Sequence, residues 1–355
     1  MQTLEQSFSG KKVLLTGHTG FKGSWLAFLL NEVGAEVTGL ALPPDSAANH
    51  FDLLKLDRKI NHVVADIRDT AVVTKTVKEF QPEFVFHLAA QALVRPSYDD
   101  PVATFSTNVM GSVNLLEAVR QCETVRSLIY ITSDKCYENV EWIWGYREND
   151  QLGGRDPYSA SKAAAELAFS TYSRSFFDER PKLGAASTRA GNVIGGGDWA
   201  VDRIIPDCIR AIQAGEPIRL RNPEATRPWQ HVLEPLSGYL LLAAHLHEEP
   251  KKWGGSWNFG PSSEEVRTVK SVAEAIVGYI GKGSVESVES KTQVHEARLL
   301  HLNCDKANHS LGWYPRWDVD KTLEATALWY KVAMADGDAE AITRAQIKEF
   351  FSEQL

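Results

Sequence analysis

The segment DPYSASK, residues 156–162, places a tyrosine and a lysine at a spacing that suits proton transfer. Asp156 is a helix-capping residue type and Pro157 suits the first helical position, so a helix is expected to begin here. Tyr158 and Lys162 then lie one turn apart on the same face. Such a lysine stabilises the phenolate and lowers the tyrosine pKa toward neutrality. The phenolate is then a base that can deprotonate an alcohol while hydride leaves the carbon that carries the hydroxyl. An accidental pair on a surface helix is the alternative.

A second chemical feature is TSDKCY, residues 132–137, which follows the apolar run SLIYI. Buried parallel strands are unbroken apolar runs, so Asp134 and Lys135 mark either the exposed edge of a strand or the mouth of a site. These residues alone leave both interpretations open.

The motif TGHTGFKG places Gly17, Gly20 and Gly23 between an apolar run of strand length and a helical segment. Glycines there allow a tight turn and close approach of a pyrophosphate, whose charge the helix amino terminus attracts. The motif therefore predicts a dinucleotide site. His18 and Lys22 are candidates to bond phosphate or ribose oxygens, with a solvated loop face as the alternative.

The end of the second predicted strand lacks the acidic residue that often reads the adenine ribose. Leu40, Ala41 and Leu42 stand at this place, and no arginine is there to hold a 2′-phosphate. The sequence therefore favours NAD over NADP, held less firmly than where a carboxylate is present.

These features need a sheet and helices to position them. Apolar runs of strand length, such as KKVLLTG, AEVTGLAL, EFVFHLAA, SLIYITS and LGAASTRAG, alternate with segments of helical periodicity. This alternation predicts a doubly wound parallel α/β sheet of Rossmann type over residues 1–190. Residues 191–355 predict a smaller α/β substrate domain, with some segments returning to the first domain. The stretch DGDAEAITRAQIKEFFSEQL predicts an amphipathic helix without assigned chemistry.

Composition restricts the classes of function. The 355 residues carry a formal net charge of −8, so the overall charge does not favour binding to nucleic acid or to an anionic membrane. The four cysteines lack the spacing of a metal site or a disulfide framework. We therefore expect no bound metal, and we expect the protein to work in a reducing compartment. No segment reads as a signal peptide or a membrane span, and a cytoplasmic location is therefore expected.

Together, the glycine motif, the alternating elements and the Tyr/Lys pair resemble the extended members of the short-chain dehydrogenase/reductase superfamily. The resemblance implies that Asp66 and Ile67 flank the adenine, that HLAA runs beneath NAD, and that Asn108 is the structural asparagine of the following helix. The cofactor residues expected in this way are Gly17, His18, Gly20, Phe21, Lys22, Gly23, Asp66, Ile67, Leu88, Ala89, Ala90, Asn108, Tyr158 and Lys162.

Within this superfamily, SDKCYEN, RAGNVIGGGDWAVDRIIPD and TRPWQHVLEPLSGYL resemble the nucleotide-sugar 4,6-dehydratase branch. The Asp-Lys pair, where dTDP-glucose relatives have Asp-Glu, resembles members that act on CDP-D-glucose. The implied reaction is NAD-dependent dehydration to CDP-4-keto-6-deoxy-D-glucose, a step toward deoxysugars of surface polysaccharide such as the O antigen of lipopolysaccharide. The expected catalytic residues are Ser133, Asp134, Lys135, Tyr158 and Lys162, and the expected substrate-binding residues are Asn192, Arg203, Arg227 and Arg298.

The resemblance also implies roles at the acid–base pair. It implies that Asp134 delivers a proton to the departing 6-hydroxyl. For the base, we predict that Lys135 takes the C5 proton, directly or through one water, because Lys162, the cationic nicotinamide and the exclusion of water all disfavour the positive charge of Lys135. A charged Lys135 that merely holds the 4-keto oxygen or Asp134 is the alternative.

Other functions stay open on the sequence. They are a nucleotide-sugar 4-epimerase, a dehydratase for another nucleoside-diphosphate sugar, and a dinucleotide-sensing module without activity. The resemblance further implies a homodimer or a dimer of dimers, paired through the helices that contain Asn108 and Tyr158.

Overall fold

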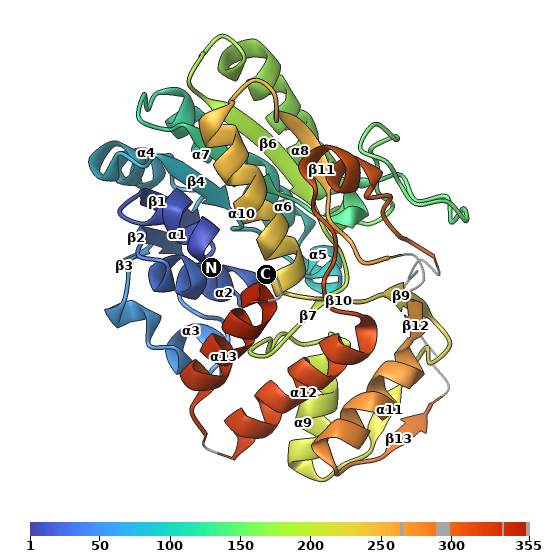
Figure 1. The fold of residues 1–355 in the computed structure, drawn as a ribbon. Coiled ribbons are helices and arrows are strands. Elements are labelled where there is room, and N and C mark those ends of the chain that lie inside the picture. Colours follow the sequence, from blue (N-terminus) through green and yellow to red (C-terminus); the bar gives the residue numbers. More distant parts are fainter. Residues whose placement is uncertain (263–265, 289–298, 336, 353–355) are drawn as a thin grey trace.

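A parallel sheet forms the centre of the molecule (Figure 1). The computed structural model describes the whole chain except residues 263–265, 289–298, 336 and 353–355. Within this part, the sheet has seven strands in the order β11-β6-β5-β4-β1-β2-β3, and every neighbouring pair is parallel. The doubly wound fold predicted from the alternating pattern is confirmed. The strands are β1 (Lys12–Thr16), β2 (Glu36–Ala41), β3 (Asn61–Val64), β4 (Phe84–His87), β5 (Ser127–Ile131), β6 (Gly184–Arg189) and β11 (Gly255–Asn258).

Side chains of the central strands alternate between two buried faces. Leu14, Val85 and Leu128 belong to a core that is covered by α4 (Thr70–Phe80), α7 (Ser112–Arg120) and α8 (Pro157–Tyr172). Val13 and Phe84 point into a second core, covered by α1 (Gln2–Phe8), α2 (Phe21–Glu32) and α10 (Leu233–Glu248). Because both faces are covered, the strands read as unbroken apolar runs.

The strand order reverses at β1. The chain runs outward through β2 and β3, and then crosses to β4 on the other side of β1. In open parallel sheets, ligands bind at the carboxyl ends of the strands beside such a switch point. The glycine motif follows β1 directly, so it lies at this position.

A smaller lobe lies beyond the carboxyl ends of the strands (Figure 1). Its helices are α9 (Ile204–Ala214), α11 (Val269–Ile280) and α12 (Val319–Met334). The chain leaves this lobe to form α10, which packs on the large sheet, and β11, which is the edge strand of that sheet beside β6. Its strands pair as β7 (Val193–Ile194) with β10 (Gln230–His231), β8 (Ile218–Leu220) with β13 (Val285–Ser287), and β9 (Thr226–Pro228) with β12 (Val266–Thr268).

The carboxyl-terminal stretch forms α13 (Ala339–Ser352), as its amphipathic pattern predicts. This helix returns to the large sheet, where Arg344 makes a two-bonded ion pair with Glu32 of α2.

Several short helices complete the fold. None of the helices in the described ranges is both long and apolar enough to cross a membrane. The short helices are α3 (His50–Leu53), η1 (Leu56–Arg58), α5 (Val94–Asp99), α6 (Pro101–Phe105), the π-helical η2 (Ser106–Gly111), η3 (Asp134–Cys136), η4 (Ser173–Phe177) and η5 (Ala307–Leu311).

Candidate active site

A cleft of about 1480 Å³ runs along the carboxyl ends of the strands and beneath the smaller lobe. A pocket for one small ligand is usually about 300–1,000 Å³, so this cleft has room for a cofactor and a nucleotide-sized substrate together. Its walls include the glycine motif, the segments after β4 and β5, the start of α8, and the lobe segments 190–195 and 202–207.

The glycine motif has the close packing that a dinucleotide loop needs. Gly17 has φ +77°, and a Cβ there would lie 2.7 Å from the amide nitrogen of Ala89. A Cβ at Gly23 would lie 2.0 Å from the carbonyl oxygen of Gly17. Gly20, at the amino terminus of α2, would meet only one atom, at 3.5 Å, so the loop stays open toward the cleft. These positions fit a pyrophosphate at the helix amino terminus.

His18 does not lie where its place in the motif suggested. Its side chain is buried away from the cleft, with Nε2 2.6 Å from Nδ1 of His62 and the ring packed against Phe51. Burial, with His62 adding to it, lowers the pKa of His18 to about 3. Both the phosphate-binding role and the solvated loop face are therefore wrong for this side chain, because the turn directs it under β2.

Phe21 and Lys22 do line the cleft. Burial and then the charge of Arg203 lower the pKa of Lys22 to about 8, while Asp134 and Asp198 oppose this shift. Lys22 thus belongs to the group of charged side chains at the centre of the cleft.

The segment after β3 carries an ion pair that sequence reasoning missed. Asp66 accepts three side-chain hydrogen bonds from Arg68, and these bonds hold the pKa of the Asp66 carboxyl below its usual range. Asp66, Ile67 and Arg68 all line the cleft, as do residues 40–45 after β2. The Asp66 carboxylate is therefore engaged by Arg68. The spacing of an acid and a base two residues apart was the available signal.

The segment after β4 reaches the cleft, but Asn108 does not. Leu88, Ala89 and Ala90 line the cleft. Asn108 is buried in η2, where its amide donates to the Gln91 carbonyl and to Ser161 Oγ and accepts from the Gln91 backbone. Asn108 therefore holds the loop after β4 against α8, and a direct contact with the cofactor is not its role.

The turn after β5 brings an acid, a base and a hydroxyl into the cleft. Ser133 Oγ donates to Asp134 Oδ1 at 2.9 Å, and it accepts from the Lys135 backbone amide at 3.3 Å. Asp134 is 4% exposed, while Lys135 is half-buried, and both line the cleft. A Cβ at Gly191 would lie 1.9 Å from Asp134 Oδ2, so a glycine at 191 makes the space for this carboxylate. TSDKCY is thus the mouth of the site, and the strand-edge interpretation is wrong.

Tyr158 and Lys162 lie in the same cleft, on the first two turns of α8. Asp156 caps this helix by accepting from the Ser159 amide, and Pro157 takes the first position, as predicted. The Tyr158 side chain lies beside Ser133. The predicted constellation of Ser133, Asp134, Lys135, Tyr158 and Lys162 is therefore brought together in one place.

The expected depression of the Tyr158 pKa is wrong for the ligand-free molecule. Burial raises the pKa of Tyr158 to about 12, although the neighbouring Ser133 and the charge of Arg203 oppose it. Burial also lowers the pKa of Lys162 to about 8, and Lys22 adds to this effect. The reason is that removal of water disfavours a phenolate more than the nearby cations stabilise it.

Basic side chains surround the lobe side of the cleft. Asn192, with φ +50°, Arg203 and Arg227 line it as predicted. Arg203 makes an ion pair with Asp198 at 2.9 Å. Arg227 lies on the short strand β9. Arg298 lies outside the described residues.

Further arginines of the cleft were missed, among them Arg95, Arg219 and Arg221. Arg95 and Arg221 both bind Asp202, at 2.9 and 3.1 Å, and Arg219 lies beside them on β8. The alternation Ile-Arg-Leu-Arg at residues 218–221 was a usable signal, because alternate residues of a strand share a face.

Known proteins resemble this chain over nearly its full length. A sequence profile of the GDP-mannose 4,6-dehydratase family matches residues 14–326. The chain is 46% identical over 349 residues to CDP-glucose 4,6-dehydratase of Salmonella typhimurium, covering 97% of each chain.

Two solved structures have the same fold. One is the UDP-glucose 4-epimerase of Thermus thermophilus in complex with NAD, with a TM-score of 0.78, 26% identity, and coverage of 91% of this chain and 99% of that one. The other is the dTDP-glucose 4,6-dehydratase of Streptomyces venezuelae, with a TM-score of 0.77, 23% identity, and coverage of 92% and 99%. From the profile match and the shared identity, the chain belongs to the GDP-mannose 4,6-dehydratase family.

Proposed function

We propose that this protein is a nucleotide-sugar 4,6-dehydratase that binds NAD and converts CDP-D-glucose into CDP-4-keto-6-deoxy-D-glucose and water. One observation carries the proposal: the Asp134 carboxylate is seated in the cleft, where it accepts a hydrogen bond from Ser133, and Tyr158 lines the same cleft. An acid at this point serves the loss of a hydroxyl group. The choice of CDP-D-glucose is supported by the 46% identity to a CDP-glucose 4,6-dehydratase.

The NAD site consists of the glycine loop, the segment after β3 and the segment after β4. Gly17, Gly20 and Gly23 would hold the pyrophosphate, with Phe21 and Lys22 in the same wall of the cleft. Residues 66–68 would hold the adenosine end, and residues 88–90 would hold the middle of the dinucleotide. When bound, NAD would supply the hydride acceptor for C4 and, once reduced, the hydride donor for C6.

Oxidation at C4 is assigned to Tyr158. The oxygen of its phenolate form takes the proton of the sugar 4-hydroxyl and becomes the neutral phenol, while Ser133 holds the same hydroxyl through its Oγ. Lys162, one helical turn away, is the cation that stabilises the phenolate before the proton is taken. Because the pKa of Tyr158 is raised to about 12, chiefly by burial, the phenolate needs this stabilisation at neutral pH.

Elimination is assigned to the turn after β5. The 4-ketone acidifies the C5 hydrogen, and Lys135 takes this proton while protonated Asp134 gives one to the departing 6-hydroxyl. The C5–H and C6–O bonds break, a C5–C6 double bond forms, and one water leaves. The sugar then regains hydride at C6 and a proton at C5, so no external reductant is consumed.

The diphosphate is assigned to the arginines of the lobe side, Arg203 and Arg227 first, with Asn192 close to the sugar. Guanidinium groups suit this role because their N–H donors match pairs of phosphate oxygens.

The proposal is tested by incubating the protein with NAD and a panel of nucleoside-diphosphate glucoses. We expect product formation from CDP-D-glucose, with the mass of one water lost and a new C6 methyl signal in the proton NMR spectrum. A product of unchanged mass would mean a 4-epimerase, the activity of the Thermus relative. Turnover of another nucleotide would correct the base, and binding without turnover would favour a sensing module.

Cofactor choice has its own test. We expect NAD to bind more tightly than NADP, because residues 40–42 offer no cation for a 2′-phosphate. Titration of both cofactors, with Arg68→Ala as the matched variant, checks this expectation. Tighter binding of NADP that is lost in Arg68→Ala would mean that Arg68 reads the 2′-phosphate.

We also propose a cytoplasmic homodimer. Val102 on α6, Met110 on η2 and Leu167 on α8 are exposed by 77%, 55% and 59%, and they lie on the helices expected to pair. The four cysteines are buried free thiols, which fits a reducing compartment. Sedimentation is expected to give a dimer or a larger assembly, and a change of Leu167 to Lys is expected to weaken it. A monomer at micromolar concentration would contradict the proposal.

A further inference from the structure

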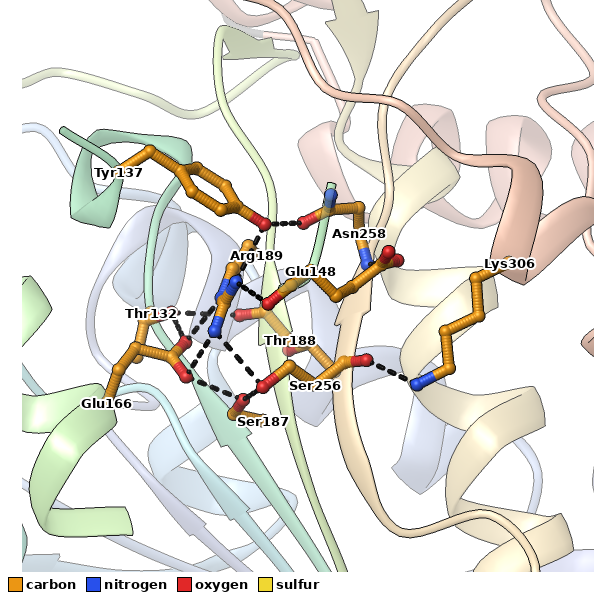
Figure 2. Close-up of polar contacts among 10 residues, drawn as sticks. All are labelled: Thr132, Tyr137, Glu148, Glu166, Ser187, Thr188, Arg189, Ser256, Asn258 and Lys306. Atoms are coloured by element: carbon orange, nitrogen blue, oxygen red, sulfur yellow. Dashed lines mark hydrogen bonds and ion pairs between the residues drawn. The ribbon is translucent and has the colours of Figure 1, made fainter. Parts of the chain in front are cut away.

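A fully buried ion pair joins Glu166 of α8 to Arg189 of β6 (Figure 2). Arg189 Nε and Nη2 donate to the two carboxylate oxygens at 3.0 and 2.9 Å. Each of the two residues is 2% exposed. Burial raises the pKa of the Glu166 carboxyl, but the charge and the hydrogen bonds of Arg189 outweigh burial and lower it overall. The Glu166 carboxylate and the Arg189 guanidinium are therefore both charged.

The guanidinium group of Arg189 is fully used. Its remaining N–H groups donate to Tyr137 Oη at 2.7 Å, to the Glu148 carbonyl at 3.0 Å and to Ser256 Oγ at 3.1 Å. Together with the two bonds to Glu166, these occupy all five donors that an arginine has. A lysine cannot reproduce this fork.

The pair holds both ends of the catalytic turn (Figure 2). Thr132, immediately before Ser133, donates its hydroxyl to Glu166 Oε1. Tyr137, immediately after η3, accepts from Arg189, lies with its ring 4.8 Å from the guanidinium carbon, and donates to Asn258 Oδ1. The residues between these two anchors include Asp134 and Lys135.

The same pair reaches the helix of the oxidation residues. Tyr158, Lys162 and Glu166 follow one another at intervals of four along α8, so they share one face of the helix. Glu166 is thereby fixed to α8 and, through Thr132, to the turn after β5. Among the described residues that line the cleft, neither Glu166 nor Arg189 is present. They do not touch a ligand, so their effect on chemistry has to pass through the turn.

We propose that Glu166 and Arg189 are positioning residues that set the distance and orientation of Asp134 and Lys135 relative to Tyr158, and that elimination depends on them more strongly than oxidation does. The inference rests on the proposed dehydratase function. Tyr158 and Lys162 keep their spacing from the helix itself. Asp134 and Lys135 stand on a short turn, whose place is given by the contacts at its two ends.

The test compares three variants that loosen the turn by different amounts. Thr132→Val and Tyr137→Phe each remove one hydrogen bond to the intact pair, and Arg189→Lys keeps the charge but removes the fork. Arg344→Lys is the matched control, because Arg344 and Glu32 form a similar two-bonded pair between α13 and α2, outside the cleft lining.

Two rates are measured in deuterium oxide with CDP-D-glucose as substrate. The elimination rate is given by deuterium entry at C5 and by methyl formation, and the oxidation rate at C4 is monitored by the nicotinamide absorbance. The quantity compared between variants is the elimination rate divided by the oxidation rate. CDP binding without added cofactor and the melting temperature are measured on the same samples. We expect the ratio to fall by about 10-fold in the single-bond variants and about 100-fold in Arg189→Lys, since a misplacement of about 1 Å is worth that much. CDP affinity and the ratio in Arg344→Lys should stay at the wild-type level.

Each outcome decides a different point. If oxidation and elimination fall equally in the three variants, or if the ratio stays constant while the melting temperature drops, the pair is merely structural and the inference is overturned. Should Arg189→Lys fail to fold, Thr132→Val and Tyr137→Phe decide alone. A wild-type protein that forms no methyl product from any nucleotide sugar would instead overturn the proposed function.

Discussion

Tyr158 and Lys162 stand on a helix of 16 residues, whereas Asp134 and Lys135 stand on a 3₁₀ turn of three. The helix carries its own geometry, because its hydrogen bonds and the Asp156 cap fix the spacing of the two side chains. The turn has little geometry of its own.

Distant residues define the place of the turn. Gly191 leaves the space for the Asp134 carboxylate, and the Glu166–Arg189 pair holds the anchors Thr132 and Tyr137. From this comparison we expect oxidation to depend on a local motif and elimination to depend on contacts between distant segments.

The largest effect should come from removing the base on the helix. Tyr158→Phe leaves no group to take the 4-hydroxyl proton, so turnover is expected to fall by about 100- to 10,000-fold. Tyr172→Phe, on the same helix but outside the cleft lining, is the control and should stay near wild type. Turnover of Tyr158→Phe close to wild type would place the base elsewhere.

Loss of the base on the turn should separate the two half-reactions. In Lys135→Met, C4 oxidation is expected to persist while deuterium entry at C5 and methyl formation fall by about 100-fold, the scale of general-base catalysis. Lys182→Met, at an exposed lysine outside the cleft lining, is the matched control. Deuterium entry at the wild-type rate in Lys135→Met would show that Lys135 only holds its neighbours.

A smaller change should disturb the turn from across the cleft. Gly191→Ala places a methyl group 1.9 Å from the present position of Asp134 Oδ2, so the carboxylate has to move. We expect elimination to slow by about 10- to 100-fold with a smaller effect on oxidation. Gly278→Ala is the control, because a Cβ there meets no atom within 4 Å. Equal slowing of both steps would mean that Asp134 also serves oxidation.

The smallest effect concerns stability and pH. The pKa of Lys162 is about 8 in the folded protein, below the ordinary 10.5, so the unfolded chain binds more protons between these values. Stability should therefore rise with pH from about 8 to about 10.5, and the cost of the buried cation should be fully present below about pH 8.

Urea unfolding of wild type and Lys162→Met checks this sign. Below about pH 8 the variant should be more stable than wild type, by an amount on the order of 1 kcal/mol, and this difference should shrink as the pH rises. A difference that does not change with pH would mean that Lys162 is not a buried cation in the ligand-free protein.

Much of the fold was predictable from the sequence because its signals are local. Alternating apolar runs and helical segments indicate a parallel sheet with both faces covered, and β1, β2, β4, β5 and β6 match the predicted runs. The cap at Asp156, the interval between Tyr158 and Lys162, and the glycines at 17, 20 and 23 follow from neighbouring residues in the same way.

What only the tertiary structure decided depends on segments that are distant in the sequence. His18 belongs to a phosphate-loop motif, but it is buried against His62 of β3, 44 residues away. Gly191 has a role only because its backbone approaches Asp134. Burial by the surrounding layers also raises the pKa of Tyr158 to about 12, a shift opposite to the one that the Tyr-Lys spacing predicts. The sequence by itself thus determined which groups are the candidates for the chemistry, because residue type and helical spacing are local properties. Their orientation and their protonation were decided by packing, since both depend on which atoms of distant segments exclude water and occupy the neighbouring space.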